Sequence, residues 1–210
     1  MSHTEITDFP KYLPLLAFPN TVLTPDSSEN ITLEGPQGLS LLAEVIKNKN
    51  YLGVVQMVDH QGETDLFTTG TLAKLRITDM TTKSVTFNLL GLRCFDVQEF
   101  IKTDQNFYAA KVSYTRYETK EKEPKNIDRA SLLHSFKRLL SYLDYQDFDM
   151  NLFEEHSDER LVKELMDFCP LGNLEKQHIL ETSALEQQTA LLRQYIEESM
   201  LGPLVAFTRH

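Results

Sequence analysis

The chain of 210 residues is 41% hydrophobic and 25% charged, and its formal net charge is −10. This length and composition suit one large globular domain or two small subdomains that bury a core. Because acidic residues outnumber Lys and Arg, the chain does not have the basic surplus that binds phosphate backbones, and nucleic acid is disfavoured as a partner. No apolar run reaches the roughly 18 residues of a membrane span, and the polar start shows no signal-peptide pattern. We therefore expect a cytoplasmic protein that does not bind membranes.

The first half of the chain predicts strands interrupted by one helix. Apolar residues recur at helical spacing in QGLSLLAEVIKNK, residues 37–49, and Tyr51–Val58 is a compact β-branched run typical of a buried strand. The polar stretch Thr78–Ser84 is expected to be a turn. Further strands are expected around residues 13–23, 31–33, 72–77, 85–97 and 107–114.

The second half predicts helices. Three stretches, residues 132–143, 161–166 and 185–196, carry apolar stripes that are typical of helices packing on a core. Ser157 is expected to cap the second helix, Asn173 to cap a further helix at 174–181, and Ser183 with Glu186 to form a capping box.

The order of these elements predicts an α+β protein in two parts. We expect a β-rich subdomain at 1–118 and a helical subdomain at 127–200. The polar, proline-containing stretch 119–126 is expected to be a charged linker, and 201–210 a tail.

Nothing in the sequence predicts an enzyme. The chain contains no G-x-S-x-G elbow, and no glycine is followed by lysine as a phosphate-binding loop requires. Cys94 and Cys169 both lie in apolar contexts, and the sequence predicts buried free thiols rather than nucleophiles or a disulfide. The dense acidic run 154–159 and the Asp144–Asp149 rhythm lack the geometry of zinc and calcium sites. No metal and no cofactor is expected.

Four segments from three parts of the chain together resemble the N-terminal domain of the Lon protease family. The opening LPLLAFPNTVLTP, residues 13–25, is similar to the family's LPLxPLxxxVLFPG. GTLAKL at 70–75 and LGLRCFDV at 90–97 resemble GTVAxI and EGLxRFxI. PLGNLEKQHILE at 170–181 resembles PLSLEEKQxLLE, with Gly172 or Asn173 near the family's capping serine.

The resemblance covers about residues 12–198 and implies a stand-alone Lon substrate-binding domain without the ATPase and peptidase. The fold that it implies is a PUA-like β pseudo-barrel with one early helix, followed by a C-terminal helical bundle. One segment departs from the family pattern, because Asp26–Gly35 is polar and acidic where the family has an apolar, proline-containing strand. Client binding by that strand is therefore in doubt.

Two functions compete. The resemblance implies a non-catalytic module that binds protein or unfolded polypeptide at exposed apolar segments, with candidate contacts Phe18, Pro19, Asn20, Leu90 and Arg93.

The alternative is a regulatory or scaffold protein that binds one defined partner through its helical half. The apolar residues of the acidic stretch 147–155 would make that contact, namely Phe148, Met150, Leu152 and Phe153. RNA binding and a hydrolase of unknown type are disfavoured, by the negative charge and by the missing catalytic residues respectively.

Overall fold

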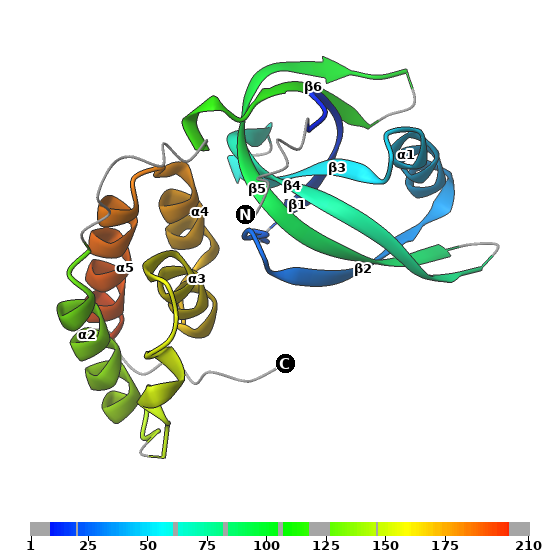
Figure 1. Ribbon diagram of the computed structural model, residues 1–210. Helices are drawn as coiled ribbons and strands as arrows, with labels where there is room; N and C mark the ends of the chain where they lie inside the picture. Colours follow the sequence, from blue (N-terminus) through cyan, green and yellow to red (C-terminus); the bar gives the residue numbers. More distant parts are fainter. Residues whose placement is uncertain are drawn as a thin grey trace, which may run out of the picture. The chain divides into compact units, whose positions relative to one another are not determined.

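The chain divides into two compact units, Met1–Glu118 and Thr119–His210, which are called here the barrel unit and the helical unit (Figure 1). A computed structural model describes residues 9–19, 21–60, 63–81, 84–104, 107–117, 127–145 and 147–201. The expected linker at 119–126 lies outside the described residues, and so does the expected tail apart from Leu201.

The barrel unit is a six-stranded sheet in the order β2-β5-β4-β3-β1-β6. Strand β6 pairs with β1 and also with the end of β5, so five strands close into a ring and β2 stays outside it. The β1–β3 pair is parallel and the other pairs are antiparallel. The strands are β1 (Tyr12–Pro19), β2 (Ser28–Glu34), β3 (Tyr51–His60), β4 (Glu63–Met80), β5 (Ser84–Lys102) and β6 (Tyr108–Ser113).

The barrel unit buries two apolar clusters because its strands alternate side chains between two faces. One cluster draws on all five ring strands and includes the fully buried Phe95. The other is completed by the helix α1 (Gly35–Lys47), whose Leu41, Leu42 and Val45 pack on the face that carries Phe87 of β5. In Figure 1 this helix lies beside β3 and β2.

An arm of three strands extends beyond the ring. It consists of β2, the start of β5 (Ser84–Leu90) and the end of β4 (Lys74–Met80), which pair in the register Ile31–Phe87–Ile77. Strand β4 continues to Met80, so the turn predicted at Thr78–Ser84 is shorter than expected.

The helical unit packs its helices around one aromatic-rich core that contains Phe136, Leu165 and Leu192. Asp128 and Ser157 cap the first two α-helices, since their side chains accept hydrogen bonds from the backbone N–H of Ser131 and Arg160. The cap predicted at Ser157 is therefore confirmed. The elements are η1 (Thr115–Tyr117, in the barrel unit), α2 (Arg129–Tyr142), η2 (Met150–Phe153), α3 (Asp158–Phe168), α4 (Asn173–Glu181) and α5 (Leu185–Ser199).

Two predicted helix caps are wrong. Helix α4 begins at Asn173 and is capped by Gly172, whose N–H donates a 2.5 Å hydrogen bond to Glu175 Oε2. Helix α5 begins at Leu185 with Ala184 at the cap position, so Ser183 precedes the cap and Glu186 stands one position too early for a capping box. The predicted α+β class, a β-rich part followed by helices, is confirmed.

Candidate functional site

The first three segments of the resemblance meet at one junction in the barrel unit. The loop that follows β1 lies against the middle of β4 and β5. Thr71 Oγ1 donates a buried 2.6 Å hydrogen bond to Leu23 O. Asp26 N–H donates to Gly91 O, and Gly91 N–H donates to Ser27 O, both at 2.9 Å. These bonds fix residues 23–27 on the ring before the chain enters β2.

The glycines of the two strand motifs are required by close backbone approach at this junction. A Cβ atom on Gly91 would lie 2.2 Å from Thr24 O, and one on Gly70 would lie 2.4 Å from Val54 O. Real Cβ atoms do not come so near to a carbonyl oxygen, so only glycine fits without a backbone shift. The motif residues Gly70, Thr71 and Gly91 therefore stabilise the fold through these contacts.

A surface of mixed character borders this junction. We define the Leu90 surface as Leu90, Lys74, Tyr51, Phe9 and Arg93. The side chain of Leu90 is 42% exposed, and in the sheet register it lies opposite Lys74. Lys74 Nζ lies 3.9 Å from the centroid of the Tyr51 ring, and the Arg93 guanidinium lies 5.6 Å from that of Phe9. The Phe9 and Tyr51 rings meet edge to face at 6.1 Å, which makes the surface continuous.

Two residues predicted as polypeptide contacts, Leu90 and Arg93, thus lie on one surface. The other predicted contacts are at the end of β1. Pro19 is exposed, whereas Phe18 is half-buried and packs on the cluster beneath α1. Asn20 lies outside the described residues. Opposite Phe18 in the register, Gln56 is 4% exposed, and its Oε1 has no hydrogen-bond partner among the described residues.

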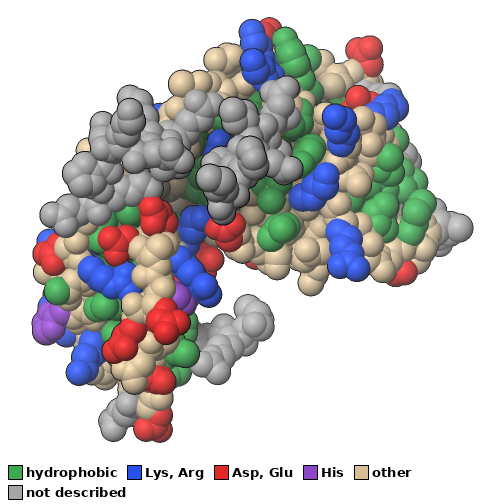
Figure 2. All heavy atoms as spheres, in the orientation of Figure 1, with side chains coloured by type: hydrophobic (Ala, Val, Ile, Leu, Met, Phe, Trp, Pro, Cys, Tyr) green, Lys and Arg blue, Asp and Glu red, His purple; other side chains and the backbone are tan. Residues whose placement is uncertain are grey.

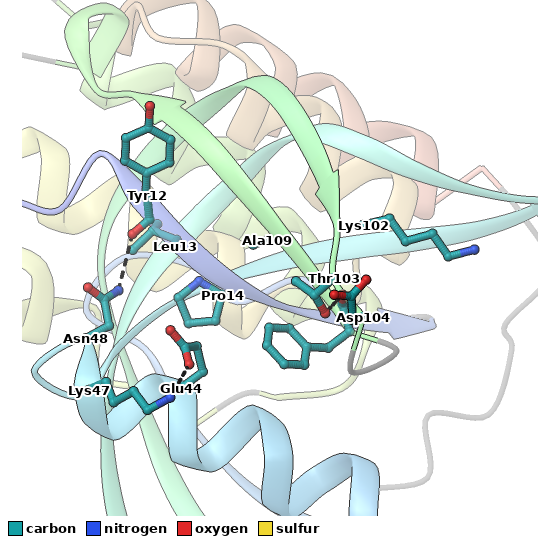
Figure 3. A pocket seen from close by; sticks show the side chains of 11 residues that line it. Tyr12, Leu13, Pro14, Glu44, Lys47, Asn48, Lys102, Thr103, Asp104 and Ala109 are labelled. Carbon is teal, nitrogen blue, oxygen red and sulfur yellow. Dashed lines mark hydrogen bonds and ion pairs between the residues drawn. The ribbon is translucent and has the colours of Figure 1, made fainter.

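A hollow of about 550 Å³ lies elsewhere in the barrel unit, between the end of α1, β1 and the β5–β6 turn (Figure 3). Its apolar lining includes Pro14, Phe107 and Ala109. Charged residues of both signs border it: Glu44, which pairs with Lys47 at 2.9 Å, and Lys102 and Asp104. No sequence pattern predicted this hollow, because it is formed by three segments that are distant along the chain.

The apolar residues proposed for partner binding in the helical unit differ in exposure. Phe153 is 4% exposed and belongs to the core, and the rings of Phe136 and Phe148 surround it at 5.7 and 5.8 Å. Met150 is half-buried against the same core. Leu152 is 60% exposed and is the most exposed member of the set. The stretch 147–155 is thus attached to the helices by most of its apolar side chains.

The ionisable side chains near these surfaces have structural partners. Arg116 Nη2 donates hydrogen bonds to Asp96 Oδ1 at 2.6 Å and to Thr69 Oγ1 at 3.0 Å. Tyr117 joins them, with its hydroxyl 3.3 Å from Asp96 Oδ1, and burial raises the pKa of Tyr117 to about 12. This cluster holds η1 on β5 and keeps the end of the barrel unit in place.

The described residues contain no group of three or more His, Cys, Asp or Glu side chains placed to hold a metal ion. Cys94 and Cys169 are buried free thiols, as predicted. Burial raises the pKa of Cys169 to about 12, so this thiol stays protonated and unreactive at neutral pH. Among the described helices, none is both long enough and apolar enough to cross a membrane.

The fold and the site define a small α+β domain in which a closed strand ring carries a built surface of mixed character and is followed by a helical unit. A family model described as the ATP-dependent protease La (LON) substrate-binding domain matches residues 12–198. The chain belongs to this Lon substrate-binding domain family. The match is to the substrate-binding domain and not to the ATPase or peptidase domains.

A sequence relative and two solved structures agree with this assignment. The Lon protease of Parabacteroides distasonis is 25% identical over 190 residues, which cover 84% of this chain and 22% of that protein. This chain thus spans about a fifth of its relative's length. The fold resembles a Lon N-terminal domain protein from Xanthomonas campestris, with 18% identity, a TM-score of 0.64 and coverage of 88% of this chain and 98% of that chain. It also resembles the N-terminal domain of a Mycobacterium avium complex Lon protease, with 15% identity, a TM-score of 0.66 and coverage of 90% and 99%.

Proposed function

We propose that this chain is a non-catalytic protein-binding domain that recognises exposed apolar segments of other polypeptides. Family membership over residues 12–198 supports the binding role. The observation that carries the finer proposal is the Leu90 surface. There an exposed leucine lies opposite Lys74 and three residues before Arg93, and each of these cations covers an aromatic ring.

The Leu90 surface can make two kinds of contact with an unfolded chain: burial of an apolar side chain and hydrogen bonds to backbone carbonyl oxygens. The exposed part of Leu90 can bury against an apolar side chain, which contributes about 1 kcal/mol. Lys74 and Arg93 can donate hydrogen bonds to the carbonyl oxygens that an unfolded backbone leaves unpaired. Neither interaction reads a particular sequence, so the expected binding is broad and weak.

The magnitude of binding follows from these contributions. Micromolar affinity requires about 8 kcal/mol, which is more than one leucine contact supplies. Additional apolar area is therefore needed, and Pro19 at the end of β1 is a further exposed apolar residue of the barrel unit. We expect dissociation constants of roughly micromolar order for long unfolded chains and weaker binding for short ones.

The test is a fluorescence anisotropy titration of a labelled, permanently unfolded polypeptide, run beside the folded form of the same polypeptide. Saturable binding of the unfolded form alone is expected. Leu90→Glu should weaken it by about tenfold, because a charge replaces the apolar contact. The matched control is Leu174→Glu on α4, a leucine that is 62% exposed in the helical unit, and its binding should equal that of wild type.

Two results would contradict the proposal. If the unfolded polypeptide does not bind, the proposed function is wrong. Equal loss of binding in the Leu90 and Leu174 variants would remove the assignment to the Leu90 surface. Phe18 is a poor probe of binding, because its half-buried ring packs on the core and a charge there would also destabilise the fold.

The alternative function, binding of one defined partner through the helical unit, is favoured by two exposed apolar side chains. Leu152 is 60% exposed and Phe168 is 46% exposed, and both belong to the helical unit. A single partner in fixed stoichiometry that is lost with Leu152→Glu and retained with Leu90→Glu would support this alternative. Size-exclusion chromatography with light scattering on the co-purified complex measures that stoichiometry.

A further inference from the structure

Strand β2 is the outermost strand of the arm. It pairs with β5 from Ser28 to Glu34, and no other strand pairing of β2 occurs among the described residues. In an antiparallel pair, every second residue turns both its N–H and its C=O away from its partner strand. Apart from the ladder with β5, no backbone hydrogen bond within the described residues reaches β2. The outer edge of β2 therefore presents unpaired backbone donors and acceptors.

The two faces of β2 differ in chemistry. Ile31 and Leu33 are half-buried and turn toward the cluster beneath α1. On the opposite face, Asn30 Oδ1 accepts a 3.0 Å hydrogen bond from Asn88, and Thr32 Oγ1 lies 2.9 Å from Thr86 Oγ1. These cross-strand bonds hold β2 flat against β5, so the edge is a preformed template and needs no ordering before it pairs.

Charge indicates what can pair with this edge. Glu29 and Glu34 stand near the two ends of β2, both exposed, and the strand contains no Lys or Arg. Neither carboxylate has an ion pair within the described residues. A second copy of β2 would bring four carboxylates together, and like charges across a strand pair are destabilising. A segment that carries basic residues is attracted instead.

The side chains along β2 determine which types of residue suit each position of a segment that pairs with it. Directly opposite residues in a strand pair share one face of the sheet. Basic residues suit the positions opposite Glu29 and Glu34, apolar residues those opposite Ile31 and Leu33, and hydroxyl-bearing residues those opposite Asn30 and Thr32. Read along an antiparallel strand, the fitting order is basic, apolar, polar, apolar, polar, basic.

We propose that the outer edge of β2 binds an extended segment of a client polypeptide by antiparallel strand addition and prefers apolar segments flanked by basic residues. Main-chain hydrogen bonds supply the affinity, and the alternating side chains supply the preference. This inference rests on the proposed function, since it names the binding mode and the preferred segment of the same domain. It also explains how the polar and acidic segment 26–35, where the chain departs from its family pattern, can still take part in binding.

The test uses synthetic peptides as probes of the full chain. The probe is the labelled hexapeptide Lys-Val-Thr-Val-Thr-Lys, extended by Gly-Ser at both ends. One comparison peptide has Glu in place of both Lys residues. A second has N-methyl groups on the two valines, and a third has them on the two threonines, so that alternate donors are removed. Anisotropy titrations at low and at physiological ionic strength measure the affinity of each peptide.

Strand addition predicts three results together. The Lys peptide should bind about tenfold more tightly than the Glu peptide, and added salt should reduce this difference. One of the two N-methylated peptides should lose binding and the other should retain most of it, because only alternate N–H groups face β2. The protein variant Glu29→Lys/Glu34→Lys should invert the preference. The control Glu154→Lys/Glu155→Lys, with the same change of net charge in the helical unit, should not.

The outcomes separate this inference from the proposed function. If the unfolded polypeptide binds but the N-methylated peptides bind alike and the Glu29/Glu34 variant keeps the wild-type preference, strand addition is wrong and the proposed function stands. If neither the unfolded polypeptide nor any peptide binds, the proposed function has failed as well. Circular dichroism of each protein variant confirms that exposed charge reversal leaves the fold unchanged.

Discussion

The barrel unit and the helical unit differ in the burial of the apolar side chains predicted as contacts: Leu90 of the barrel unit is exposed, whereas Phe153 of the helical unit is buried. In the barrel unit, the chain comes so close to itself at Gly70 and Gly91 that backbone fills the space, and Leu90 stays outside. In the helical unit, the connection between α2 and α3 turns Phe153 into the core and packs Phe148 beside it. An apolar residue in a motif or a loop is therefore not by itself evidence of a binding surface, because its exposure depends on the path of the backbone around it.

The largest effect is expected from truncating Phe153, which tests whether this ring is packed in the core of the helical unit. Phe153→Ala removes a fully packed ring from the aromatic cluster, and we expect the free energy of unfolding to fall by about 4 kcal/mol. Urea denaturation followed by circular dichroism measures it. Leu152→Ala, one residue away and exposed, should cost less than about 0.5 kcal/mol. Similar losses in both variants would show that Phe153 is not the packed member of the pair.

Gly91→Ala tests the junction of the barrel unit. The added methyl group would meet Thr24 O at 2.2 Å, so either the loop or β5 has to move, and we expect a loss of about 3 kcal/mol in the free energy of unfolding. The control is Gly172→Ala in the helical unit, where the nearest atom would be Glu175 Oε2 at 3.4 Å. That variant should cost no more than about 1 kcal/mol, because alanine is a poorer N-cap than glycine but meets no close contact. A stable Gly91→Ala protein would contradict the close approach.

Thr71→Val tests the hydrogen bond that attaches the loop to β4. The substitution keeps the shape of the side chain but leaves Leu23 O without its buried donor, and should cost about 1.5 kcal/mol. Thr86→Val removes an exposed hydroxyl pair with Thr32 and should cost less than about 0.5 kcal/mol. The difference between the two midpoints in urea measures the contribution of the buried bond. Equal midpoints would mean that the hydrogen bond of Thr71 does not stabilise the fold.

Gln56→Met is expected to change the free energy of unfolding least among these predictions, and it is the one substitution expected to stabilise the protein. Gln56 is buried, and its Oε1 accepts no hydrogen bond from the described residues, so an apolar side chain of similar size should raise the free energy of unfolding by about 1 kcal/mol. Gln177→Met is the matched control. It removes a buried amide that donates to Glu181 Oε1 at 3.1 Å, and it should destabilise by a similar amount. The sign of the change, read from the thermal midpoint, decides the prediction.

The sequence predicts those parts of the fold in which structure follows from local periodicity. The apolar stripes of the helical half place α2, α3 and α5 correctly, and the compact run 51–58 places β3. Ring closure could not be predicted, because the pairing of β6 with β1 joins residues nearly a hundred positions apart. The predicted box at Ser183 is wrong because the chain turns into α5 one residue later than the pattern indicates.

The candidate site was predictable only in part. Leu90 and Arg93 stand in a recognisable motif, and the structure places both on one surface. The aromatic partners Phe9 and Tyr51 come from segments without a motif and reach that surface only through strand pairing and the path of the chain before β1. Burial of Phe153 depends on how the connection packs on α2, and its acidic neighbours gave no signal of this.

We propose that the barrel unit makes the contact with polypeptide, through the Leu90 surface and the neighbouring edge of β2. Amide resonances of the isotope-labelled protein, followed during titration with the permanently unfolded polypeptide, test this claim most directly. We expect saturable shifts at β2, at Leu90–Arg93 and at Lys74, together with unchanged resonances at Leu152, Phe168 and the rest of the helical unit. Shifts confined to the helical unit, with β2 and Leu90 unchanged, would contradict it.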